Sequence, residues 1–105
     1  MRVAAYQAAL PIAGSMNALE AIRAQVQRCE KEHIDILCCP EAVLGSLADY
    51  DRDPSRFSIA ANTGLLNTVL SPLASVTVTS IVGFTELGDD GRIYNSAAVL
   101  QRTAV

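Results

Sequence analysis

A short apolar run that ends at a proline and a glutamate constrains the fold of this chain most strongly. Residues 34–41 read IDILCCPE, and charged residues precede them. Nearly continuous apolar character predicts a strand buried on both faces, as in the parallel sheet of an α/β protein. Pro40 has no N–H for a strand ladder and keeps Cys39 extended, so the strand should end there. Glu41 is therefore expected at the edge where open α/β sheets bind their ligands.

The segments before this strand complete a βαβ unit. Residues 17–32 carry apolar side chains three and four positions apart, which predicts an amphipathic helix. Asn17 and Glu20 have the spacing of an N-cap and its capping glutamate, and Ser15 is an alternative cap. Residues 2–8 are predicted to form a first strand, which should run parallel to the strand of residues 34–39.

The second half of the chain predicts one more helix and a hairpin. Residues 64–74 carry an apolar stripe, but Pro72 should kink or end that helix. Residues 76–86 and 93–100 are rich in β-forming residues and flank the turn sequence GDDG, which predicts two antiparallel strands. The predicted order is β-α-β-α-β-β, and the fold class is α/β.

Composition narrows the classes of function. A length of 105 residues allows one domain, and 50% hydrophobic residues predict a globular core. The net charge is −3 and the basic residues are scattered, so we expect no nucleic-acid partner. No stretch is long and apolar enough for a membrane span, and Gln7 and Pro11 interrupt any signal-like segment. Three cysteines, two of them adjacent, favour reduced thiols in a cytoplasmic protein.

Four short motifs resemble the N-terminal half of the nitrilase superfamily of carbon–nitrogen hydrolases. In chain order they are VAAYQ at 3–7, CPE at 39–41, IVGFTE at 81–86 and IYNSA at 93–97. Their order and spacing resemble those of the family, and the resemblance covers essentially the whole chain. It implies that residues 1–105 form a single, incomplete domain, the N-terminal part of an α-β-β-α sandwich.

The resemblance implies a catalytic role for one residue of this chain, Glu41. In that family a glutamate at the position of Glu41 is the general base, a lysine steadies the oxyanion, and a cysteine attacks an amide or nitrile carbon to form a thioester. The family's lysine and cysteine would fall beyond Val105, and the only lysine here is Lys31, on the polar face of the first helix. The complete enzyme would hydrolyse a small amide or nitrile without a cofactor, and this chain alone would be inactive. The alternative is a non-catalytic α/β interaction module or a truncated gene product.

Residues 42–63 form a polar, turn-rich stretch that leaves directly from Glu41. Loops of this length in compact domains are usually functional. Tyr50 is a candidate to line a substrate pocket there, and an exposed loop tyrosine is the alternative. Cys38 and Cys39 lie inside the apolar strand, so we expect both to be buried packing residues rather than nucleophiles.

No metal site is expected. Asp49, Asp51 and Asp53 alternate as at the start of an EF-hand loop, but Pro54 and Ala60 occupy the positions of its glycine and its last glutamate. His33 precedes Cys38 and Cys39, yet no second pair of zinc ligands follows.

The predicted sheet should leave one face uncovered. Residues 34–39 place apolar side chains on both faces, but only two helices are available. If successive crossovers advance in one direction across the sheet, both helices cover the same face. A bare apolar face usually marks an interface, so we expect a homo-oligomer that associates through this sheet face.

Overall fold

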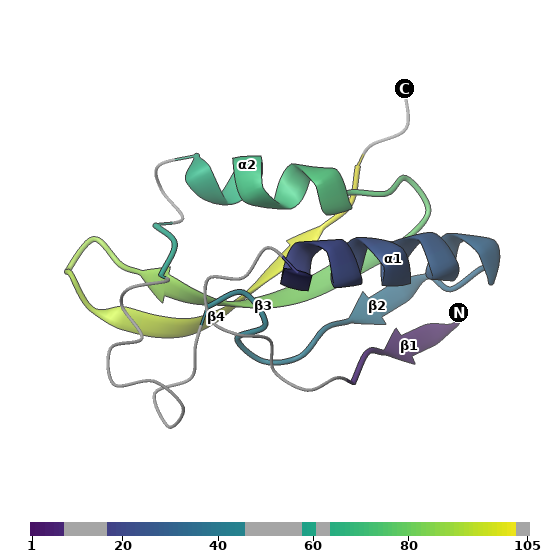
Figure 1. Ribbon diagram of the computed structural model, residues 1–105, viewed down its shortest axis with the longest axis horizontal. Helices are drawn as coiled ribbons and strands as arrows, with labels where there is room; N and C mark the ends of the chain where they lie inside the picture. The colour runs from purple at the N-terminus through teal and green to yellow at the C-terminus, as the bar shows by residue number, and fades with distance from the viewer. Residues whose placement is uncertain (8–16, 46–57, 61–63, 103–105) are drawn as a thin grey trace.

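The described residues form a four-stranded sheet with two helices (Figure 1). The computed structural model describes residues 1–7, 17–45, 58–60 and 64–102. The strand order is β1-β2-β3-β4, which is also the order along the chain. The first three strands are parallel and the last is antiparallel to β3. The strands are β1 (Val3–Ala5), β2 (Ile36–Cys38), β3 (Thr79–Leu87) and β4 (Ile93–Leu100). The predicted mixed α/β class and element order are confirmed.

Helix α1 (Asn17–Lys31) ends in a turn that returns the chain to the sheet. His33 adopts a left-handed φ of 57°, and the Ile34 N–H donates to the Cys29 carbonyl oxygen over 2.9 Å. This is the hydrogen bond of a Schellman cap. The cap uses the Ile34 N–H, so β2 begins at Ile36 and is shorter than the predicted strand over residues 34–39.

Strand β1 is also shorter than predicted, and a polar contact anchors its start. The Arg2 N–H donates to Asp35 Oδ2 over 2.8 Å, while the Arg2 carbonyl accepts from the Asp35 N–H over 2.9 Å. The Tyr6 N–H still donates to the Cys38 carbonyl beyond the end of the strand. Parallel pairing of the first two strands is therefore confirmed.

Pro72 ends the second helix as predicted. Helix α2 (Leu65–Leu70) passes directly into a single 3₁₀ turn, η3 (Ser71–Leu73), which contains Pro72 in its first positions. Proline lacks the N–H that an α-helix interior needs, whereas the first turn of a helical segment needs no such donor.

Strands β3 and β4 form the predicted hairpin. Their register runs from Ser80 opposite Leu100 to Leu87 opposite Ile93. The Gly91 N–H donates to the Gly88 carbonyl over 3.0 Å, and Gly91 has a φ of 77° that favours glycine.

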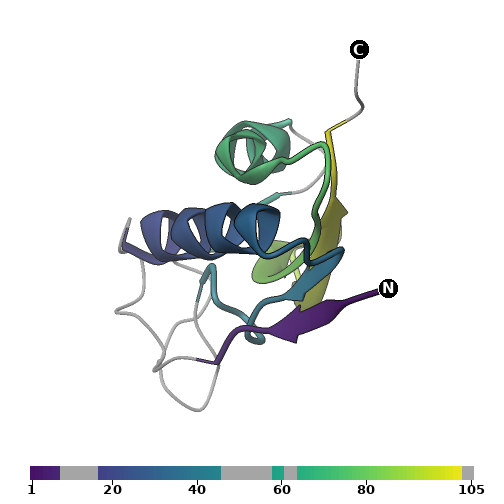
Figure 2. The ribbon, with the colours of Figure 1, turned by 90° about the vertical axis from the view of Figure 1, so that its right-hand side faces the viewer.

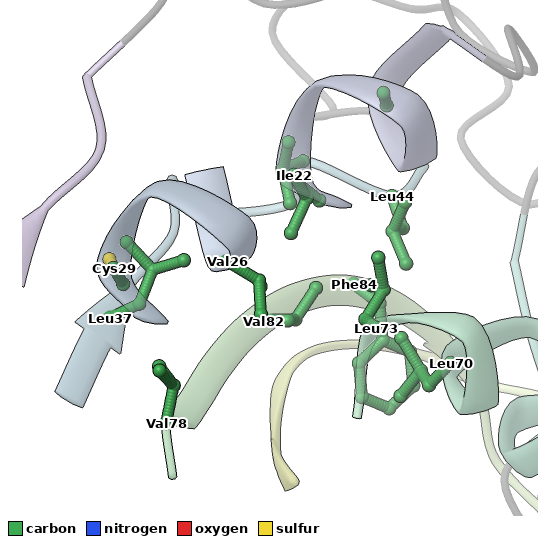
Figure 3. Packing of buried hydrophobic residues seen from close by; sticks show 12 residues of the cluster. Ile22, Val26, Cys29, Leu37, Leu44, Leu70, Leu73, Val78, Val82 and Phe84 are labelled. Carbon is green, nitrogen blue, oxygen red and sulfur yellow. The ribbon is translucent and has the colours of Figure 1, made fainter. Parts of the chain in front are cut away.

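Both helices cover the same face of the sheet, as Figure 2 shows. The core lies between them and the strands, where Ile22 and Val26 of α1 meet Leu37 and Val82 of the sheet (Figure 3). Several of its side chains are almost fully enclosed, namely Ile22, Leu37, Leu73, Val78 and Val82.

The opposite face carries an apolar row that crosses the whole sheet. The register places Ala5, Cys38, Ile81 and Val99 side by side. Val99 is 69% exposed, and no helix of the described residues lies on this side. We call this surface the bare face. The expected arrangement of two helices on one face is confirmed.

Candidate functional site

Glu41 lies where β2 ends, in a tight turn beside β3. The Cys39 N–H still donates to the Ile81 carbonyl, so pairing with β3 continues to Cys39. The Val43 N–H then closes the turn on the Pro40 carbonyl over 3.3 Å. Leu44 resumes parallel contact with Phe84. The turn therefore interrupts the ladder for a few residues and presents the exposed Glu41 side chain.

Gly83 of β3 supports this turn from below. A Cβ atom at residue 83 would lie 2.7 Å from the Pro40 carbonyl oxygen, 2.7 Å from the Ala42 nitrogen and 3.1 Å from the Glu41 Cα. All three are backbone atoms, so no side-chain rotation could make room. Ala42 has a φ of 48°, a left-handed conformation that L-residues rarely adopt. The missing side chain at Gly83 thus lets the turn lie directly on the strand.

Asn95 of β4 contacts the Glu41 carboxylate. Its side-chain Nδ2 donates a hydrogen bond to Glu41 Oε1, although the two residues are 54 positions apart. Asn95 pairs with Thr85 in the ladder, two positions from Gly83. Alternate residues of a strand point to the same face, so Asn95, Gly83 and the row through Ile81 share the bare face. Asn95 lies within the IYNSA motif, but no pattern in the sequence predicted its contact with Glu41.

A second carboxylate lies on the other side of the sheet. Ser96 Oγ donates to Glu86 Oε1 over 2.7 Å in a partly buried position. Ser96 pairs with Phe84, which packs in the core beneath the helices. Glu86 and Glu41 are therefore on opposite faces and form no carboxylate pair.

The two thiols at the C-terminal end of β2 are less enclosed than predicted. Cys38 and Cys39 are both half-buried, so the expectation of full burial was wrong. Cys38 belongs to the row of the bare face, whereas Cys39 packs against the edge of the core. Burial raises the pKa of the Cys39 thiol to about 11, with smaller contributions from Cys38 and Cys29. A thiol with that pKa is protonated at neutral pH and is a poor nucleophile.

The remaining candidates do not approach Glu41 or lie outside the described residues. Lys31 is the last residue of α1, which leads to the start of β2, and Glu41 follows the end of that strand. Tyr50 and the three aspartates Asp49, Asp51 and Asp53 lie outside the described residues. His33 serves in the turn after α1. Within the described residues, no group of three or more His, Cys, Asp or Glu side chains could hold a metal ion.

No helix in the described part of the chain combines the length and apolar character needed to cross a membrane. Comparisons with protein-family models, with curated proteins and with solved structures find no match.

Proposed function

We propose that this chain supplies the general base of a nitrilase-type carbon–nitrogen hydrolase, and that Glu41 is that base. One observation carries the proposal. The Glu41 carboxylate stands at the C-terminal end of a parallel strand, and its backbone rests on Gly83. Ligands of open α/β sheets bind at this edge. The motifs CPE, IVGFTE and IYNSA, which resemble those of the family, contribute Glu41, Gly83 and Asn95 to the same place.

The chemistry assigned to Glu41 is proton removal from a cysteine thiol. The thiol proton moves to the carboxylate, and the electron pair stays on sulfur as a thiolate. The thiolate then adds to the carbon of a small amide or nitrile, whose developing negative charge requires a cationic or N–H donor. Cys39 is held protonated by its raised pKa, and Lys31 lies toward the other end of β2. As the resemblance implies, we expect the nucleophile and the cation to come from elsewhere, and residues 1–105 alone to be inactive.

Two assays test this function. Ammonia release from a panel of amides and nitriles is measured for residues 1–105, and we expect none above the blank. The reading frame downstream of Val105 is then followed, and its whole product is expressed and assayed. We expect a lysine and a later cysteine in frame, turnover by that product, and a loss of at least about a hundredfold on Glu41→Gln. Turnover by residues 1–105, or a whole product whose turnover survives Glu41→Gln, contradicts the proposal.

A second candidate function is a non-catalytic interaction module, and the bare face favours it. The row of Ala5, Cys38, Ile81 and Val99 has no charged side chain. The apolar row itself therefore adds no charge repulsion between two copies with a net charge of −3 each, although the Glu41 carboxylate lies on the same face beside Asn95. We propose a second copy of this chain as the partner, packed sheet against sheet. Sedimentation equilibrium at micromolar concentration should show a dimer or larger species, and a monomer that binds no hydrophobic dye contradicts it.

A further inference from the structure

The contact between Asn95 and Glu41 joins two separately anchored pieces of backbone. Asn95 is fixed in the β3–β4 ladder opposite Thr85. Glu41 is fixed by the turn that rests on Gly83. The hydrogen bond from Asn95 Nδ2 to Glu41 Oε1 therefore crosses β3 between two rigid supports. Both side chains are exposed, so burial does not force them together.

We propose that Asn95 is a positioning residue that holds Glu41 by Oε1 and leaves Oε2 as the oxygen that takes the proton. This inference rests on the proposed role of Glu41 as general base. In the described residues, Glu41 Oε2 has no hydrogen-bond partner. A side-chain amide nitrogen only donates, and it carries no charge. Asn95 can therefore orient the carboxylate without competing for the proton that Glu41 must accept.

Orientation matters because a base must lie within hydrogen-bond reach of the proton that it removes. A glutamate side chain has several rotatable bonds, and an exposed one ordinarily samples several rotamers. A hydrogen bond from Asn95 to Glu41 Oε1 restricts the rotamers of the glutamate and so fixes the direction in which Oε2 points. Loss of that donor should thus lower the turnover rate more than it weakens substrate binding.

Nuclear magnetic resonance of the labelled 105-residue chain tests the contact without any activity. Glu41→Gln should shift the Asn95 side-chain amide signals, because it replaces a carboxylate acceptor with a neutral amide. Side-chain couplings of Glu41 should show one dominant rotamer in the wild type and averaging in Asn95→Ala and Asn95→Asp. Asn67, exposed on α2, provides a reference amide within the same spectra.

Ser96→Ala is the matched control. It removes a hydrogen bond from a neighbouring position of β4 to a different carboxylate on the other face, so the Glu41 rotamer should not change. A Glu41 side chain that is equally ordered in wild type and Asn95→Ala would overturn the inference, as would Asn95 amide signals that Glu41→Gln leaves unchanged.

Kinetics of the whole reading-frame product separate this inference from the proposed function. In that whole product, Asn95→Ala should lower kcat by about tenfold to a hundredfold with little change in KM. If the Asn95–Glu41 contact is intact but the whole product shows no turnover, the proposed function is refuted. The assignment of Glu41 Oε2 as the oxygen that takes the proton is then refuted with it. Turnover that depends on Glu41 but not on Asn95 would refute only the positioning role.

Discussion

Gly83 lies directly beneath Glu41, and a Cβ atom at residue 83 would approach the Glu41 Cα to 3.1 Å. The backbone of the turn thus occupies the volume that a side chain would need. A carboxylate at the end of a strand is common, but a carboxylate whose backbone rests on a neighbouring strand has a defined position. This contact links the ladder of β3 to the candidate base.

Gly83→Ala should displace the turn that carries Glu41. The added methyl group would meet the Pro40 oxygen and the Ala42 nitrogen at 2.7 Å, so the free energy of unfolding should fall by about 1–3 kcal/mol. The Glu41 and Asn95 side-chain resonances should shift as well. Gly64→Ala is the control, because that site is open and has a φ of 80°. Gly64→Ala should lower the free energy of unfolding by about 1 kcal/mol, because alanine at this positive φ strains the backbone. It should leave the Glu41 and Asn95 resonances unchanged.

Modification of Cys39 by a thiol reagent should be slow in the folded protein. With a pKa of about 11, only about one Cys39 side chain in a thousand is a thiolate at pH 8. In denaturant the pKa of the Cys39 thiol should return toward its ordinary value of 9.0, and the thiol should react about a hundredfold faster. Peptide mapping of the modified sites gives the rate for each cysteine. Equal rates at Cys39 in buffer and in denaturant would contradict the raised pKa.

The same shift predicts a loss of stability at alkaline pH. Between pH 9 and 11 the unfolded Cys39 loses its proton while the folded thiol keeps it, so stability is complete below pH 9 and declines as pH rises. The full shift corresponds to about 2–3 kcal/mol, and solvent screening of the half-buried thiol should make the measured decline smaller than that. Urea titrations at several pH values measure it, and Cys39→Ala should flatten the profile. Any slope left in the variant belongs to other groups with a raised pKa, such as Cys29 and Tyr94.

Val99→Lys should disrupt self-association through the bare face. Val99 is 69% exposed in the apolar row, on the edge strand β4, and a lysine there would place a charge within each sheet-to-sheet contact. The apparent dissociation constant from sedimentation should rise at least about tenfold. Leu65→Lys is the control, because Leu65 is 51% exposed on α2, among the helices that cover the other face. Equal dissociation constants for the two variants would place the interface elsewhere.

The sequence by itself determined the elements and their order. Apolar spacing predicted α1, and β-forming residues on both sides of a turn sequence predicted the hairpin strands, because helical periodicity and residue preference are local properties. Pro40 ends β2 near Cys39, and Pro72 ends α2, because proline has no N–H to donate to a strand ladder or a helix. The placement of Glu41 at the strand end followed from these local rules.

Only the tertiary structure decided what surrounds Glu41. Asn95 is 54 residues away, and its contact with Glu41 depends on the register of β3 with β4, which apolar patterns do not specify to the residue. The exposure of Cys38 depends on which face the helices cover, a property of the whole sheet rather than of its own strand. Long-range packing sets both, whereas periodicity and proline geometry act only between near neighbours in the chain.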